Sequence, residues 1–285
     1  MSFDSVRKLF MVPFIEKILA YPPKRPQSLL GKILPGNYLY PKNSIRKIQK
    51  DGISLELDLH DYVEHFIYFN YITAEEKVLC SSAKPGMVVF DIGTNIGYVA
   101  LKLAKQVGDS GKVYGFEPDP VNFKKAYRNI TELNTWCTNV HIENMGLGDK
   151  KGQFKLYAIE EGNNGMHQVR NDDLTGVNFS TITIEVIDEY IVNNNIPGPQ
   201  LIKIDTEGYE MNILRGSIKT LQTYRPVLFI EVDDNNLKLQ NQSASSLINF
   251  ISSLNYNIVN VQTGNKVNLT DNFSDCHFDV LCSPN

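Results

Sequence analysis

A glycine-rich turn led by an acid occupies residues 91–97 of this 285-residue chain. An apolar run ends at Asp91, and Gly93 and Gly97 follow with the spacing Gly-x-x-x-Gly. Glycine allows backbone conformations and a close ligand approach that a Cβ would prevent. The spacing differs from the Gly-x-Gly-x-x-Gly of dinucleotide sites, and a carboxylate beside a pyrophosphate is repulsive. The turn therefore favours a ligand that carries an ammonium group, with an ordinary strand-to-helix turn as the alternative.

A second acid, Glu117, ends the next predicted strand, 24 residues after Gly93. In nucleotide-binding α/β folds, an acid at about this separation accepts hydrogen bonds from a ribose diol. A cap for the following helix is the other interpretation, but Asp119 suits that role better because aspartate is a favoured N-cap residue. We therefore expect Glu117 to bind a ribose.

Three charged side chains accompany a further apolar strand at residues 200–205. Lys203 and Asp205 stand two residues apart, so they share one face of that strand. Ligands in open α/β sheets bind at the carboxyl ends of strands, which is where Asp205 and Glu207 lie. Helix capping is an alternative for Glu207 and Glu210, but it does not account for a lysine and an aspartate near the end of a buried strand. Asp205 and Glu207 are therefore expected where a donor and an acceptor meet.

Taken in order, these segments resemble the FkbM-type family of S-adenosylmethionine-dependent methyltransferases. The resemblance covers residues 53–232, with a weaker tail to residue 282. It is carried by Asp91-Ile-Gly-Thr-Asn-Ile-Gly97, Phe116-Glu-Pro118, Lys203-Ile-Asp-Thr-Glu-Gly-Tyr-Glu210, Leu214-x-Gly216 and Arg225-Pro-Val-Leu-Phe-Ile-Glu231. It implies a Rossmann-like class I methyltransferase fold and the transfer of a methyl group from S-adenosylmethionine to a hydroxyl, often of a sugar or natural product.

The resemblance also implies roles for individual residues. The residues that would contact the methionine part of the cofactor are Asp91, Gly93, Asn95 and Gly97. Those that would contact the ribose and flank the adenine are Glu117, Pro118, Asn144, Met145 and Gly146. Asp205 corresponds to a position that lines the transfer site.

The chemistry of methyl transfer narrows the search for catalytic groups. Transfer from a sulfonium is an in-line displacement, in which the protein mainly supplies alignment and a water-poor site. A hydroxyl acceptor must also lose a proton, which favours a positioned base. Asp205 is the first candidate and Glu207 the second, while Lys203 could steady a developing alkoxide or keep Asp205 ionised.

His167 is a different candidate base, because histidine titrates near neutral pH. It lies in the polar, glycine-containing stretch 162–178, which is predicted to form a loop over the site. A single histidine in a loop is more often a surface residue, so both interpretations stay open.

No metal site is predicted. Asp205 and the Asp-Asp-Asn segment at 233–235 could converge on Mg²⁺ or Ca²⁺, which prefer oxygen ligands. A polar turn after a strand accounts for the same segment and is favoured. Cys80, Cys137, Cys276 and Cys282 form no CxxC pair, so neither a structural zinc site nor a disulfide scaffold is expected.

The elements that position these residues alternate between strands and helices. Strands are predicted at 53–59, 87–91, 112–117, 139–145, 153–159, 180–187, 200–205, 226–232, 256–261 and 277–282. Helices are predicted at 61–80, 97–107, after 118–120, at 209–222 and at 244–254. This alternation indicates an α/β fold with a parallel sheet covered on both faces. Together with the family resemblance, it predicts a mostly parallel seven-stranded sheet whose last strand is antiparallel.

Charge divides the chain into two parts. Residues 1–50 carry ten Lys and Arg against two Asp and Glu, a net charge of +8, whereas the remainder carries 18 against 30, a net charge of −12. The acidic body argues against a nucleic-acid partner. The basic arm either contacts an anionic membrane surface or packs on the body as a solvated arm. Its proline-rich part, residues 21–50, is predicted to be an irregular connector.

Composition fits a globular protein, with 42% hydrophobic and 21% charged residues. The sequence has no apolar run of about 18 residues and no clear export signal, so we predict a cytoplasmic location, with peripheral membrane contact through residues 1–50 as an option. We divide the chain into an N-terminal extension, residues 1–52, and a methyltransferase domain, residues 53–285.

Two other classes of function stay open. One is an NAD(P)-dependent oxidoreductase on a Rossmann fold, whose glycine pattern is missing here. The other is a module that binds a nucleotide without turnover, since binding residues alone do not prove catalysis. In the favoured interpretation the cofactor is S-adenosylmethionine and the acceptor is a small molecule or a glycan.

Overall fold

The computed structural model describes residues 3–22, 24, 28–71, 73–159, 162–170 and 174–285. The chain divides into two compact units, a smaller one of residues 1–73 with 160–166 and a larger one of residues 74–159 with 167–285. The strand expected at 53–59 belongs to the smaller unit. The functional division after residue 52 into an extension and a methyltransferase domain stays a prediction.

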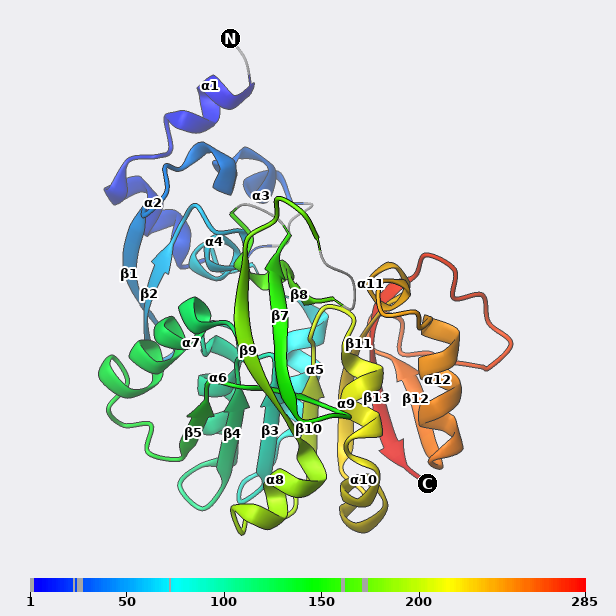
Figure 1. Ribbon diagram of the computed structural model, residues 1–285. Coiled ribbons are helices and arrows are strands. Elements are labelled where there is room, and N and C mark those ends of the chain that lie inside the picture. Colours follow the sequence, from blue (N-terminus) through cyan, green and yellow to red (C-terminus); the bar gives the residue numbers. More distant parts are fainter. Residues whose placement is uncertain (1–2, 23, 25–27, 72, 160–161, 171–173) are drawn as a thin grey trace. The chain divides into compact units, whose positions relative to one another are not determined.

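The larger unit is built on a seven-stranded sheet with the order β12-β13-β11-β10-β3-β4-β5 (Figure 1). Its strands are β3 (Val88–Ile92), β4 (Lys112–Phe116), β5 (Val140–Glu143), β10 (Leu201–Ile204), β11 (Val227–Asp233), β12 (Tyr256–Asn260) and β13 (His277–Pro284). Neighbouring strands are parallel except at β13, which runs antiparallel to both β11 and β12. The predicted Rossmann-like class I methyltransferase fold, with its antiparallel last strand, is confirmed.

The apolar sequences of β3 and β10 account for the central, buried position of these two strands in the sheet. Their sequences, Val-Val-Phe-Asp-Ile and Leu-Ile-Lys-Ile, are apolar and rich in β-branched residues, and every residue in them is buried. This is expected of parallel strands that are covered on both faces. Phe90, Ile92 and Ile202 point into the main hydrophobic core. Because side chains alternate along a strand, Asp91 and Lys203 face the other way.

Helices cover both faces of this sheet (Figure 1). The helices described in the larger unit are α5 (Ala74–Ser82), α6 (Tyr98–Val107), α7 (Pro120–Tyr127), α8 (Ile187–Asn193), α9 (Glu210–Arg215), α10 (Ile218–Tyr224), α11 (Asp234–Lys238) and α12 (Ala244–Ser253), with a π-helical turn at Arg128–Glu132. The connections from β3 through β4 to β5 run outward in one direction, and those from β10 to β11 run in the other. Since such crossovers are right-handed, α6 and α7 pack on one face and α9 and α10 on the opposite face.

The strand order reverses between β3 and β10, which are neighbours in the sheet. In open α/β sheets this switch point is where ligands bind, outside the carboxyl ends of the strands. Asp91 of β3 and Lys203 of β10 are register partners there. The fold thus brings two charged residues from distant parts of the sequence to the position where a cofactor is expected.

Two predicted helices are each divided in the structure. The predicted helix 61–80 is in fact α4 (Tyr62–Tyr68) in the smaller unit and α5 in the larger one. The predicted helix 209–222 breaks into α9 and α10 at Gly216. A Cβ at Gly216 would lie 2.0 Å from the carbonyl oxygen of Gly148, so this position admits only glycine.

The strands predicted at 153–159 and 180–187 exist, but they form a sheet of their own. This four-stranded sheet has the order β6-β9-β7-β8. Its strands are β6 (Gly146–Gly148), β7 (Gly152–Ala158), β8 (His167–Val169) and β9 (Phe179–Val186). The additional sheet follows β5 in the sequence and precedes α8, so it lies between the two halves of the central sheet along the chain.

The smaller unit contains short helices and a two-stranded antiparallel sheet. Its elements are α1 (Phe3–Lys8), α2 (Pro13–Ala20), α3 (Leu29–Ile33), η1 (Asn37–Leu39), β1 (Ile45–Lys50), β2 (Ile53–Asp58), α4 and η3 (Asn164–Met166). The prediction of an irregular connector at 21–50 is wrong where α3 and β1 form. Within the described ranges, no helix combines the length and the hydrophobicity that a membrane span requires.

Candidate active site

The turn after β3 needs glycine because another loop touches it. Gly93 has a φ of +82°, and a Cβ there would lie 1.9 Å from the carbonyl oxygen of Asp205. Residues with a Cβ rarely adopt this backbone conformation, and a Cβ would not fit into this space. The loop after β3 and the loop after β10 are therefore in direct contact, so Gly93 and Asp205 lie at one place.

Asp91 and Lys203 form a buried ion pair at this contact. Lys203 Nζ lies 3.5 Å from Asp91 Oδ1 and 3.3 Å from Asp205 Oδ2, and it donates a hydrogen bond to the Gly93 carbonyl at 2.7 Å. Asp91 is fully buried, and neither of its carboxylate oxygens accepts a hydrogen bond from the described residues. Burial raises the pKa of Asp91, while Lys203 opposes that rise. The ammonium of Lys203 thus forms ion pairs with two carboxylates on neighbouring elements.

Glu117, just after β4, is held by backbone amides. Its carboxylate accepts hydrogen bonds from the N–H groups of Asn95, at 2.7 Å, and Asp119, at 2.9 Å. The residue is only 5% exposed, and burial raises its pKa to about 8. Each carboxylate oxygen has a second lone pair available. The group could therefore still accept hydrogen bonds from a ligand diol.

Asn144 brings its segment to the same place. Its side-chain amide donates to the carbonyl oxygens of Glu117, at 2.9 Å, and Pro118, at 3.1 Å. Met145 packs against the main core, and Gly146 opens β6. The structure thus brings the segment Asn144-Met145-Gly146 next to Glu117 and Pro118, and its role beside the adenine stays a prediction.

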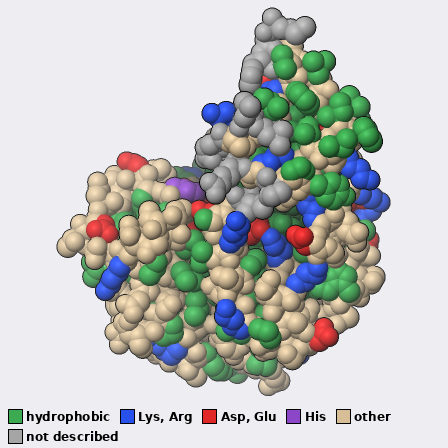
Figure 2. Space-filling view, turned by 180° about the vertical axis from the view of Figure 1, so that it is seen from behind, with side chains coloured by type: hydrophobic (Ala, Val, Ile, Leu, Met, Phe, Trp, Pro, Cys, Tyr) green, Lys and Arg blue, Asp and Glu red, His purple; other side chains and the backbone are tan. Residues whose placement is uncertain are grey.

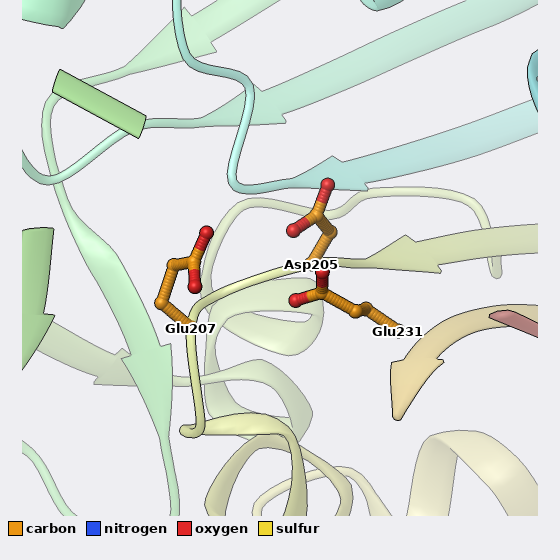
Figure 3. Close-up of side chains that lie close together, drawn as sticks. All are labelled: Asp205, Glu207 and Glu231. Carbon is orange, nitrogen blue, oxygen red and sulfur yellow. The ribbon is translucent and has the colours of Figure 1, made fainter. Parts of the chain in front are cut away.

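Three carboxylates cluster on the other side of Lys203. One oxygen each of Asp205, Glu207 and Glu231 lies within 4.8 Å of the others (Figure 3). Asp205 and Glu207 follow β10, and Glu231 projects from β11. Burial, and then the charge of Asp205, raise the pKa of Glu207 to about 8. The same causes raise the pKa of Glu231 well above its usual range.

A family model described as the methyltransferase FkbM domain matches residues 91–258. The chain belongs to the FkbM family of methyltransferases. A curated relative, hexuronic acid methyltransferase AglP of Haloferax volcanii, is 27% identical over 155 residues, which are 53% of this chain and 59% of AglP. Methyltransferase 1 of Beauveria bassiana is 26% identical over 143 residues, 45% of this chain and 57% of that protein. The match spans less than two thirds of either relative.

Solved structures include methyltransferase FkbM of Methylobacillus flagellatus, which is 16% identical to this chain with a TM-score of 0.44. The comparison covers 77% of this chain and 52% of that one. The strand order of the sheet, rather than this similarity, defines the fold here. Membership of the FkbM methyltransferases makes S-adenosylmethionine the cofactor.

The residues at the switch point fit this cofactor. Asp91 offers a buried carboxylate with two oxygens that lack hydrogen-bond donors among the described residues, which suits the ammonium of the methionine part. Glu117 retains acceptor capacity for a ribose diol. Gly93 and Gly97 have positive φ values of +82° and +85°, and α6 begins directly after Gly97. The chain therefore carries matching groups for both polar ends of S-adenosylmethionine.

Glu231 is the residue that sequence analysis overlooked in this FkbM chain. It is an acid inside the otherwise apolar strand Val-Leu-Phe-Ile-Glu-Val-Asp, and that contrast is a signal that could have found it. The segment 233–235, considered instead as a partner of Asp205, serves other contacts. Asp233 caps α11 and pairs with His277, and Asp234 pairs with Lys238. Oxygen ligands such as those of the cluster suit Mg²⁺ or Ca²⁺, but clustered acids also occur without an ion.

His167 does not lie in a loop, so that expectation is wrong. It is the first residue of β8, which pairs antiparallel with β7. Its side chain is 13% exposed, and Nδ1 lies 3.1 Å from Asp119 Oδ2. This contact with the residue that caps α7 explains the position of His167 structurally, while a catalytic role stays a prediction.

The capping interpretation holds for Glu210 but not for Glu207. Glu210 Oε1 accepts hydrogen bonds from the backbone of Thr206 and Gly208 and from the Thr206 hydroxyl. Glu207 instead accepts a hydrogen bond from the Asn236 side chain at 2.7 Å. Glu207 has a φ of +55°, a conformation that is uncommon for a side chain with a Cβ. The turn after β10 therefore presents Glu207 toward the acid cluster rather than toward the start of α9.

Proposed function

We propose that this chain is an S-adenosylmethionine-dependent O-methyltransferase that acts on a hydroxyl of a sugar, glycan or natural product. One observation carries the proposal. Asp91, Glu117 and the acid cluster all stand at the carboxyl ends of the adjacent strands β4, β3, β10 and β11. Groups suited to the cofactor and groups suited to proton transfer therefore share one edge of the sheet.

In the proposed reaction, Asp91 binds the cofactor's ammonium group and Glu117 binds its ribose diol. Asn144, Met145 and Gly146 flank the adenine. Bound S-adenosylmethionine supplies the methyl group together with its leaving group. The protein aligns donor and acceptor, and alignment of this kind is worth about 7–11 kcal/mol in well-oriented reactions.

The acceptor's proton passes to the acid cluster in this proposal. Asp205 is the first candidate base, because its side chain is 46% exposed and accessible to a substrate. Lys203 Nζ lies 3.3 Å from Asp205 Oδ2, so the two side chains form an ion pair at this point. Glu207 is the second candidate, because a pKa of about 8 suits proton acceptance near neutral pH.

The charge around the site supports a neutral hydroxyl as the acceptor. Burial raises the pKa values of Glu207 and Glu231, so that as protonated carboxyls they can hydrogen-bond a neutral hydroxyl. AglP is named a hexuronic acid methyltransferase, and a hexuronic acid carries hydroxyl groups as well as a carboxylate. The net charge of −12 over residues 51–285 likewise favours a small molecule or glycan over nucleic acid.

The test combines cofactor labelled in its methyl group with fractions of a host extract. The wild-type protein should transfer label to a sugar-containing or hydroxylated compound and should bind S-adenosylhomocysteine by calorimetry. Asp205→Asn should lower kcat by about 10²–10⁴-fold with nearly unchanged affinity for S-adenosylhomocysteine. Asp109→Asn, an exposed acid in the turn after α6, is the matched control.

Each result bears on a different part of the proposal. Absence of binding would reject the cofactor site in this chain. Binding with label found only on amines or carboxylates would reject a hydroxyl as the acceptor. Normal turnover by Asp205→Asn with a loss in Glu207→Gln would transfer the role of base to Glu207.

A further inference from the structure

Helix α2 exposes a stripe of apolar side chains. Phe14 is 73% exposed and Ile18 is 56% exposed, and they stand four residues apart on one face of the helix. Tyr21, which follows the helix and is 48% exposed, continues that spacing. A surface helix of a globular protein normally turns such a stripe toward the core. Here the stripe faces solvent.

The opposite face of α2 is anchored by a buried acid. Glu16 is fully buried, and its Oε2 accepts a hydrogen bond from Arg46 Nε of β1 at 2.8 Å. Ala20, also fully buried, lies on the same side. Because a charged group is costly to bury without its partner, this ion pair fixes the rotation of the helix about its axis. The outward direction of Phe14 and Ile18 is therefore built into the smaller unit.

The residues before α2 add to this surface. Val6 is 38% exposed, Leu9 is 65% exposed and Val12 is 47% exposed. Together with α2 they form what we call the apolar strip, which consists of Val6, Leu9, Val12, Phe14, Ile18 and Tyr21. Figure 2 shows hydrophobic side chains gathered on the N-terminal segment, with Lys and Arg side chains beside them. Contiguous apolar surface of this kind marks a binding surface.

The charge near the strip indicates what covers it. Lys8, Lys17 and Lys32 are exposed, and residues 1–50 carry a net charge of +8. Lysine is depleted in the cores of protein–protein interfaces. Exposed lysines beside Phe, Leu and Ile are instead typical of segments that lie on a lipid surface, with apolar side chains in the acyl boundary and ammonium groups among anionic headgroups.

We propose that the apolar strip, with Lys8, Lys17 and Lys32, docks this chain on the surface of an anionic lipid bilayer. The strip contributes apolar area, and the lysines contribute attraction to headgroups that salt weakens. Docking holds the chain at the membrane without a span. It is independent of methyl transfer, so it can be tested without an acceptor.

The experiment is co-sedimentation of the full chain with vesicles of phosphatidylcholine alone and of phosphatidylcholine mixed equally with phosphatidylserine. The wild-type protein should sediment with the mixed vesicles, and high salt should reduce that binding. Phe14→Ser/Ile18→Ser should weaken binding by about tenfold or more, because two exposed apolar groups are lost. Val192→Ser is the matched control, because Val192 in α8 is 72% exposed and outside the strip.

Charge is tested separately with Lys8→Glu/Lys17→Glu. These substitutions should reduce binding to the mixed vesicles, whereas Lys77→Glu, an exposed lysine of α5, should not. Because all substituted side chains are exposed, circular dichroism and thermal unfolding should match the wild-type protein. Sedimentation equilibrium without lipid measures whether the wild-type protein and Phe14→Ser/Ile18→Ser are monomers or dimers.

Three outcomes overturn the proposal. The first is a wild-type protein that stays in the supernatant with both kinds of vesicle. The second is an equal loss of binding in Val192→Ser and in Phe14→Ser/Ile18→Ser. The third is a wild-type dimer that Phe14→Ser/Ile18→Ser dissociates, with no vesicle binding, which would assign the apolar strip to a contact between two copies of this chain.

Discussion

The two sides of β10 handle carboxylates in different ways. Toward β3, fully buried Asp91 faces Lys203 at 3.5 Å, and the cation balances the acid. Toward β11, Glu207 and Glu231 stand together with Asp205, and burial and mutual repulsion raise the pKa values of both glutamates. One side thus pairs a carboxylate with a cation, although burial still raises the pKa of Asp91, whereas the raised pKa values of Glu207 and Glu231 favour their protonated forms near neutral pH.

Removing the ammonium group of Lys203 should have the largest effect, because it leaves one side of β10 without its cation. Lys203→Met leaves Asp91 without its partner in the core, so we expect a loss of roughly 3–5 kcal/mol in the free energy of unfolding. Urea denaturation followed by circular dichroism measures it. Asp91→Asn in addition to Lys203→Met should restore part of the loss, since the uncompensated charge is then gone. A change below about 1 kcal/mol in the single variant would mean that the ion pair does not set the charge balance.

Asp91→Asn alone should separate binding from folding. Lys203 keeps Asp205 as a partner, so the fold should tolerate the change. Affinity for S-adenosylhomocysteine should fall about 10- to 100-fold, because a hydrogen bond to a charged group contributes about 1.5–3 kcal/mol. Adenosine, which has no ammonium group, should bind as it does to the wild-type protein. Calorimetry with both ligands measures this, and an equal loss for adenosine would place Asp91 outside the methionine site.

Glu117 sharpens the comparison, because it is a buried acid held by backbone amides rather than by a cation. Its pKa of about 8 means that a diol, which donates to the ionised carboxylate, should bind more tightly as pH rises. Adenosine affinity should increase roughly tenfold between about pH 7 and about pH 9. Glu117→Gln should abolish the increase. The same pH dependence in that variant would assign it to another group.

The smallest effect is expected for Glu207, on the side of β10 that faces β11. Burial and Asp205 raise the folded-state pKa of Glu207 from 4.5 to about 8. The folded state therefore binds more protons between these values, and this contribution to stability is lost as pH rises through about 8. Glu207→Gln should therefore become more stable than the wild-type protein as pH rises through this range, with the largest difference at alkaline pH and little difference at acidic pH.

Thermal unfolding across that pH range measures the contribution of Glu207. Glu189→Gln, an exposed acid of α8, is the control and should not change the pH slope. A Glu207→Gln variant that keeps the wild-type slope would show that this carboxylate is ionised throughout, and the contrast between the two sides of β10 would then disappear.

Sequence patterns predicted the central sheet because its signals are local. The apolar runs of β3 and β10 and the turn through Gly93 are each readable within ten residues. The pairing of Asp91 with Lys203 follows once the strands are parallel neighbours. The ligand-binding roles of these residues remain predictions that the variants above address.

The missed features depend on contacts between distant segments. Glu231 joins Asp205 and Glu207 only because β11 lies beside β10. β8 has three residues, too few for an alternating pattern, so His167 was expected in a loop. The break between α9 and α10 reflects the approach of Gly148 to Gly216, which no helical periodicity reports.

The position of β13 has a consequence for the order of folding. This strand is inserted between β11 and β12, although it follows both in the sequence. Among the described strands of this sheet, β12 pairs only with β13, so it can join the sheet only after residues 261–284 have been synthesised. A ribosome adds about 5–20 residues each second. Until then the edge of β11 has unpaired backbone groups that nascent chains or chaperones can reach.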